Sequence, residues 1–166
     1  MCLIIVKSIH HKNTEKIAKV FARILDARIK VPKEVNPIEL QQHTLIGFGS
    51  GIYSGKHHNS ILELVDNLPE AENHEVFIFS TDGAPRLFLK YDSSFMNDQI
   101  KKNHEILKEK LISKGYSVVA EFNCGGWNTN KFLKLFGGIN KGRPNADDLK
   151  KAEEFAISLH KKLIKN

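Results

Sequence analysis

One polar segment of the chain has a composition that suits an anion, and it spans residues 8–14 directly after a short apolar run. Its sequence, Ser-Ile-His-His-Lys-Asn-Thr, offers hydroxyl, imidazole and amide groups that donate hydrogen bonds to phosphate oxygens. An amphipathic helical pattern begins at Asn13, and the first N–H groups of a helix are unpaired and attract anions. The segment therefore predicts a phosphate site, with the alternative that Asn13 and Thr14 only cap the helix.

Further segments combine glycine with polar residues, and they cover residues 50–55, 80–83 and 125–144. A planar ligand needs an apolar or aromatic face, which Ile52, Tyr53 and Trp127 offer, and glycine lets the backbone approach such a ligand closely. Two alternatives stand beside this interpretation. Tyr53 is then a surface loop residue, and Trp127 is a hydrophobic plug that holds down the long segment around it.

Short apolar runs alternate with amphipathic helical patterns along the chain, as is typical of a parallel sheet covered by helices on both faces. We expect helices from Asn13, over residues 61–68 and 98–114, and from about Asn145, where Asp148 three residues on completes a cap. The strands are expected over residues 2–7, 27–31, 43–49, 75–80 and 117–123.

Each polar segment follows one of these expected strands. In doubly wound sheets, ligands bind outside the carboxyl ends of the strands at the point where the strand order reverses. Parallel strands bring their carboxyl ends to one edge of the sheet, so the four segments are expected to form one site there.

The first segment resembles the first loop of flavodoxins, Thr/Ser-x-Thr-Gly-x-Thr. Ser8 matches the first hydroxyl and Asn13-Thr14 the closing pair, whereas His10 stands where a hydroxyl is usual and His11 or Lys12 where Gly is usual. Residues 49–55, Gly-Ser-Gly-Ile-Tyr-Ser-Gly, resemble the second flavin loop, and residues 80–83, Ser-Thr-Asp-Gly, resemble the third.

The resemblance covers nearly the whole chain and implies an α/β, flavodoxin-like, doubly wound sheet of five parallel strands in the order 2-1-3-4-5. Residues 1–166 then form a single domain that binds flavin mononucleotide (FMN). The implied phosphate contacts are Ser8, His10, Asn13 and Thr14. The complete set of expected cofactor-binding residues is Ser8, His10, His11, Lys12, Asn13, Thr14, Ser50, Gly51, Ile52, Tyr53, Ser54, Gly55, Thr81, Asp82, Gly83 and Trp127.

The chain lacks the sequence motifs that are typical of proteins binding other ligands. The first strand is followed by neither Gly-x-Gly-x-x-Gly nor Gly-x-x-x-x-Gly-Lys-Ser/Thr, and the acidic residues of phospho-receiver domains are missing from the equivalent places. The two cysteines, and the adjacent His57 and His58, have no metal-ligand spacing, so no metal is expected. The net charge of +6 is spread along helix faces, which argues against nucleic-acid binding.

The chain opens on an apolar run without a basic leader or a membrane-length segment, so we expect a cytoplasmic protein without a membrane partner. Two functions remain within the resemblance. One is a carrier of electrons between redox partner proteins, which the basic charge indicates are acidic. The alternative is an FMN-dependent oxidoreductase, of the NAD(P)H:quinone or protoporphyrinogen dehydrogenase type. Since no nicotinamide site is recognisable, the carrier is favoured.

Overall fold

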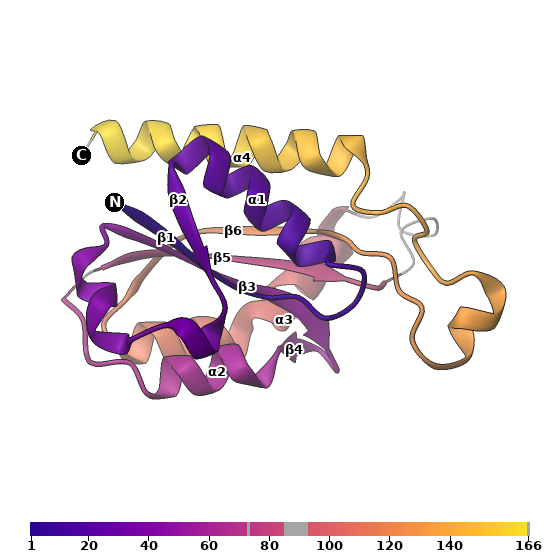
Figure 1. The fold of residues 1–166 in the computed structure, drawn as a ribbon, viewed down its shortest axis with the longest axis horizontal. Helices are drawn as coiled ribbons and strands as arrows, with labels where there is room; N and C mark the ends of the chain where they lie inside the picture. The colour runs from indigo at the N-terminus through magenta and orange to yellow at the C-terminus, as the bar shows by residue number, and fades with distance from the viewer. Residues whose placement is uncertain (73, 85–92, 166) are drawn as a thin grey trace.

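A computed structural model describes residues 1–72, 74–84 and 93–165, and it has a central parallel sheet (Figure 1). The sheet order is β2-β1-β3-β5-β6, and each neighbouring pair in this path is parallel. This confirms the predicted order of the five parallel strands. The strands are β1 (Cys2–Lys7), β2 (Ala27–Lys30), β3 (Leu45–Tyr53), β5 (Glu75–Asp82) and β6 (Ser117–Gly125).

Alternating side chains of the strands build two cores, one on each face of the sheet. On β1, Leu3 and Ile5 belong to one buried cluster, whereas Ile4 and Val6 belong to the other. Figure 1 shows α1 and α4 together over one face and α2 and α3 over the opposite face, so helices cover both faces as predicted. The helices are α1 (Asn13–Leu25), α2 (Asn59–Asp66), α3 (Ser93–Ser113) and α4 (Ala146–Lys165), with short 3-10 turns η1 (Pro32–Glu34), η2 (Pro37–Gln42) and η3 (Lys131–Phe136).

Two glycines of β3 lie beneath phenylalanine rings of the neighbouring strand. Gly47 is paired with Phe77 and Gly49 with Phe79 across the parallel ladder. A Cβ atom on Gly49 would lie 2.1 Å from the Phe79 ring, and one on Gly47 would lie 2.4 Å from the Phe77 ring. Both rings therefore lie over bare backbone, where Phe21 of α1 packs edge-on against each of them.

Strands β3, β5 and β6 extend beyond their predicted ends, and β3 and β5 carry site residues that were expected in loops. β3 continues through Tyr53 and β5 through Asp82. The extension of β3 pairs with an unpredicted antiparallel strand, β4 (Lys56–His57). Ser54 and Gly55 connect the two with φ values of 51° and 78°. Positive φ at both positions is the geometry of a two-residue hairpin turn, so residues 50–55 are a hairpin and not a loop.

The helix after β5 starts earlier than the predicted residue 98, at Ser93, and it ends before Gly115 as expected. In the described part of the chain, we find no helix with the length and apolar character needed to cross a bilayer.

Candidate functional site

A cavity of about 300 Å³ lies at the carboxyl ends of the central strands, where the sequence predicts a ligand site. It is bounded by the β1–α1 segment, the ends of β3 and β5, and the segment after β6. The lining residues are Ser8, His10, Asn13, Thr14, Gly51, Ile52, Tyr53, Ser54, Thr81, Asp82, Gly83, Gly126, Trp127, Asn128 and Asn130. Three separate sequence segments and Trp127 thus meet at one place, as expected.

His11, Lys12, Ser50 and Gly55 are not among these lining residues. The Ser50 side chain is fully buried, and its hydroxyl donates to the Gly51 carbonyl at 2.7 Å while it accepts from the His58 N–H at 2.9 Å. The Ser50 hydroxyl also lies 3.0 Å from Nδ1 of His57. The expected contact from Ser50 to a ring is therefore replaced by a structural role, because this hydroxyl holds the β3–β4 hairpin together.

The turn before α1 has a left-handed backbone at two successive residues, His11 with φ 51° and Lys12 with φ 53°. Lys12, and not Asn13, occupies the N-cap position, and it forms no side-chain capping bond. The Asn13 cap prediction is therefore wrong, because helical geometry already begins at Asn13. Its Nδ2 instead donates to the Trp127 carbonyl at 2.9 Å.

Lys12→Gly is expected to be more stable than Lys12→Ala by about 1 kcal/mol, because glycine adopts the left-handed region without the steric cost that a Cβ imposes. Both variants lose the same ion pair, between Lys12 Nζ and Glu15 at 3.9 Å, whose lysine side chain is 74% exposed. Urea denaturation of the two variants measures the difference. Equal stabilities would show that this turn does not keep left-handed geometry in solution.

Thr14 and Trp127 connect the walls of the cavity to one another. The Thr14 hydroxyl lies 2.8 Å from that of Thr81, so the start of α1 is tied to the end of β5. Trp127 stacks on His11 with ring centroids 3.9 Å apart, and its indole N–H donates to the Gly137 carbonyl at 3.0 Å. Trp127 therefore lines the cavity and also holds the long segment in place.

Tyr53 folds back over the end of its own strand. A Cβ atom on Gly51 would lie 2.7 Å from the Tyr53 hydroxyl oxygen, so the ring rests on the glycine backbone. Burial raises the pKa of the Tyr53 hydroxyl, and a hydrogen bond with the Ile9 backbone partly offsets that effect. The tyrosine is thus a half-buried wall of the site and not a free surface residue.

A carboxylate stands at the end of β5. Asp82 is only 8% exposed, and its Oδ1 accepts from the Ala84 N–H at 2.9 Å. The Asp82 carbonyl accepts from the Gly126 N–H at 2.7 Å, which joins the ends of β5 and β6. The cavity therefore combines an anion-attracting helix start on one side with a buried acidic side chain on another.

Sequence reasoning missed Gly126, Asn128 and Asn130 as lining residues. The signal was present, because residues 125–144 are rich in glycine and follow a predicted strand. The sequence does not show which part of this long segment turns back to the sheet, so only Trp127 could be predicted as a site residue.

Comparisons with known proteins identify a relative and the fold of the chain. No protein-family model matches it. The uncharacterized protein MJ0298 of Methanocaldococcus jannaschii is 51% identical over 159 residues, which cover 96% of this chain and 97% of that protein. Flavodoxin 2 of Bacillus cereus superposes with a TM-score of 0.68 at 18% identity, over 97% of this chain and 98% of the other. The chain belongs to the family of the Methanocaldococcus protein, and its fold is that of flavodoxin.

An archaeal flavodoxin also shares the flavodoxin fold, with a TM-score of 0.60 and 16% identity over 98% of each chain. The rubredoxin:oxygen oxidoreductase of Desulfovibrio gigas matches 98% of this chain with 35% of its own length, at a TM-score of 0.62 and 14% identity. The predicted resemblance is thereby confirmed at the level of the fold.

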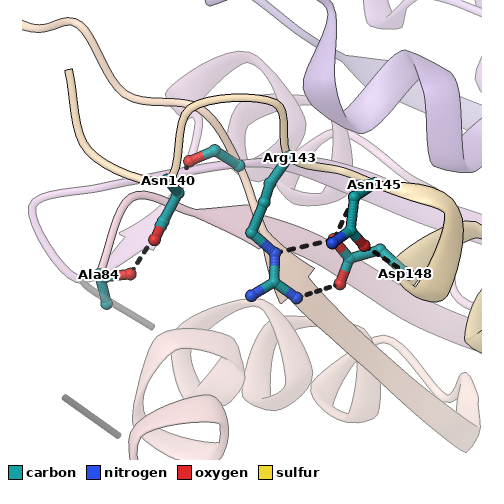
Figure 2. A network of polar contacts seen from close by, with 6 residues as sticks. Ala84, Asn140, Arg143, Asn145 and Asp148 are labelled. Atoms are coloured by element: carbon teal, nitrogen blue, oxygen red, sulfur yellow. Dashed lines mark hydrogen bonds and ion pairs between the residues drawn. The ribbon is translucent and has the colours of Figure 1, made fainter. Parts of the chain in front are cut away.

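In this flavodoxin fold, a polar network fixes the segment between β6 and α4 (Figure 2). Asn140 donates from Nδ2 to the Ala84 carbonyl at 2.7 Å, and the Arg143 guanidinium forms a two-pronged ion pair with Asp148. Asn145 and Asp148 cap each other's backbone N–H groups at 2.9 and 3.0 Å, which confirms the predicted helix start. The segment that completes the cavity is therefore anchored to the chain just beyond β5 and to the start of α4.

A second polar network lies between α3 and the strands β5 and β6. His104 of α3 contacts the Ser80 hydroxyl through Nε2 at 2.7 Å and Glu121 through Nδ1 at 2.9 Å. Asn123 donates to Ser80 and Lys108 donates to Glu121, so the network links α3 to both β5 and β6. The geometry resembles a hydrolase triad, but Ser80 is fully buried, so its hydroxyl cannot reach a substrate.

Glu121 makes stability depend on pH in the acid range. Hydrogen bonding from His104, the largest effect, and from Lys108 lowers the Glu121 pKa from 4.5 to about 2. Between pH 2 and 4.5, Glu121 is protonated in the unfolded chain but ionised in the folded one. The stabilisation from the Glu121 carboxylate is therefore complete above about pH 4.5 and is lost as pH falls toward 2. We expect Glu121→Gln to remove about 2 kcal/mol of this pH-dependent stability, measured by urea denaturation between pH 2.5 and 7.

The matched control is Glu105→Gln, which changes an exposed carboxylate on α3. The control should keep the pH dependence of the wild type. A Glu121→Gln protein whose stability falls with acid as steeply as that of the wild type would contradict the assignment.

Proposed function

We propose that this protein binds FMN in the cavity at the carboxyl ends of the strands and carries electrons between redox partner proteins. One observation carries the proposal: in a flavodoxin fold, the start of α1 and two aromatic walls enclose one cavity of about 300 Å³. That volume lies within the range of small-molecule sites. Structural relatives named flavodoxins support the same cofactor and function.

The residues at the start of α1 suit the phosphate. Ser8 and His10 line the cavity there with a hydroxyl and an imidazole. The Asn13 N–H is bonded to the His10 carbonyl at 3.2 Å, and the N–H groups that follow it at the start of α1 belong to the first turn, which lacks intrahelical partners and attracts anions. Asn13 and Thr14 also line it, but their side chains already bond to Trp127 and Thr81. We therefore assign Ser8, His10 and the backbone as phosphate donors, with Asn13 and Thr14 as residues that hold the turn.

The remaining lining residues suit a flat ring system. A Cβ atom on Gly83 would lie 2.4 Å from the Asn128 side chain, and one on Gly126 would lie 2.8 Å from the Asn13 side chain, so the walls approach bare backbone. Ile52, Tyr53 and Trp127 offer the apolar surface. When bound, FMN supplies electron transfer in one-electron steps, while these side chains orient the ring and exclude water from it.

A second cavity favours the oxidoreductase as the alternative function. It has a volume of about 390 Å³ and shares His10, Tyr53 and Ser54 with the first. Lys56 and His58 are further lining residues, so the second cavity suits a small anionic electron acceptor next to the flavin. We favour the carrier, and we place it in the cytoplasm, where soluble redox partners are available.

Equilibrium dialysis of the purified protein against FMN, riboflavin and FAD tests the cofactor. We expect FMN to bind near stoichiometrically and riboflavin at least a hundredfold more weakly, because the phosphate contributes several charge-assisted hydrogen bonds. Equal affinities for riboflavin and FMN would overturn the phosphate assignment. A redox titration then separates the two functions, since a carrier takes up electrons in two resolved steps, whereas rapid NADPH oxidation with a quinone supports the oxidoreductase.

A further inference from the structure

The segment after β6 carries three large apolar side chains that nothing in the described structure covers. Phe132 is 66% exposed, Leu135 83% and Phe136 82%, and all three belong to η3. We call them the η3 knob. Figure 1 shows the η3 segment, in orange, extending away from the sheet on the side of its carboxyl ends. Large apolar side chains gathered on a protruding turn mark an interaction site, whereas scattered ones do not.

Backbone hydrogen bonds hold the knob in a fixed shape. Asn128 and Ile139 pair in both directions, with N–H to carbonyl distances of 2.9 and 2.8 Å, and close the base of the excursion. The Gly138 N–H donates to the Leu133 carbonyl at 2.8 Å, and Trp127 reaches Gly137 at 3.0 Å. Since the backbone is already ordered, a partner that covers the knob has little conformational entropy to offset.

The base of the knob is also a wall of the proposed FMN cavity. Trp127, Asn128 and Asn130 line the cavity, and Phe132 follows two residues later along the chain. A molecule that docks on the knob therefore lies at the mouth of the cavity, where electrons must enter or leave the flavin.

The charge around the knob defines what can cover it. Lys134 on η3 and Lys141 just beyond it are exposed, and the Lys12 side chain is 74% exposed on the neighbouring turn. The whole chain has a net charge of +6. A second copy of this chain would bring the same positive charges face to face, which disfavours self-association. A membrane surface would gain only a weak attraction to each lysine and a shallow three-residue insertion, which makes a marginal anchor.

We propose that the η3 knob docks a small acidic redox protein that has an apolar recess within its acidic surface. The apolar side chains fill the recess, and the lysines steer and orient the encounter. The choice of a redox partner rests on the proposed function, because the knob adjoins the FMN cavity. The knob as an acidic-protein docking site rests on exposure, rigidity and charge alone.

A binding titration with a purified acidic ferredoxin as the probe tests this docking site. We compare the wild-type chain with the triple variant Phe132→Ser, Leu135→Ser and Phe136→Ser, using isothermal calorimetry at low and moderate salt. The matched control, Ile38→Ser with Ile164→Ser, removes exposed apolar side chains away from the cavity, which are 69% and 71% exposed. We expect the triple variant to bind the ferredoxin at least tenfold more weakly, and the control to bind like the wild type.

Flavin content and thermal unfolding are measured on the same samples. If the wild type binds the ferredoxin but holds no FMN, the proposed function fails while the docking site stands. Three results overturn the docking site: no ferredoxin binding by the wild type, equal binding by the triple variant, or tighter association with another occupant that depends on the knob. The last is detected as cosedimentation with phosphatidylserine-containing vesicles, or as a dimer in analytical ultracentrifugation, that the triple variant loses.

Discussion

Gly115→Ala is expected to lower the free energy of unfolding by about 3 kcal/mol or more. Gly115 ends α3 with φ 83°, a conformation that costs an L-residue about 1–2 kcal/mol. In addition, its new Cβ would lie 1.9 Å from the Ala71 carbonyl oxygen. That oxygen belongs to backbone, and the Ala71 N–H is itself bonded to the Lys114 carbonyl at 2.8 Å. No change of rotamer relieves the contact, so two segments must move apart.

Gly142→Ala separates the two contributions in urea denaturation. Gly142 has the same φ of 83°, but among the described residues, its two chain neighbours aside, no heavy atom lies within 4 Å of the position of its Cβ. Its replacement should therefore cost only the backbone strain, about 1 kcal/mol. If the two alanine variants lose equal stability, the contact between Gly115 and Ala71 is not present in solution.

Asp82→Asn is expected to raise the midpoint potential of bound FMN by on the order of 100 mV. The Asp82 carboxylate is a buried wall of the cavity, so its negative charge opposes the addition of electrons to a nearby flavin. Loss of about 2 kcal/mol of this repulsion shifts a one-electron step by roughly 90 mV. Asparagine keeps an oxygen that accepts the Ala84 N–H, so the shape of the site is retained.

Potentiometric titration of the FMN-loaded protein measures this shift, and Glu109→Gln is the matched control. Glu109 is an exposed carboxylate in the carboxyl-terminal half of α3, which runs toward the other end of the sheet. Its removal should change the potential little, because solvent and salt screen exposed charges. An Asp82→Asn potential equal to that of the wild type would place the flavin away from β5.

Much of the fold follows from the spacing of apolar residues. Buried strands such as Leu3-Ile4-Ile5-Val6 supply apolar side chains to both faces, and that pattern is typical of a parallel sheet between helix layers. The position of the site then follows from topology, since polar segments after such strands meet at one edge. For this reason the residues from β1–α1, β3 and β5 could be placed together before any contact was known.

The hairpin and the helix cap were missed because they depend on local backbone geometry. Ser54-Gly55 was a turn signal, but the pairing of Ile52 with His57 requires a partner strand of only two residues, too short to show a pattern. Likewise, the residue type of Asn13 favoured it as the N-cap. In the structure the left-handed Lys12 is the N-cap, so the cap lies one residue earlier than predicted. Ser50 looked like a ligand donor because no sequence pattern reveals that its hydroxyl is bonded within the hairpin.

The glycine–phenylalanine pairs between β3 and β5 constrain how this family can diverge. Because Phe79 occupies the space that a side chain at position 49 would fill, and Phe77 does the same at position 47, neither partner can change alone without a collision or a void. Accepted substitutions at these positions should therefore arise in pairs, with a larger residue on β3 accompanied by a smaller one on β5. Covariation between positions 47 and 77, and between 49 and 79, is the expected evolutionary trace of this packing.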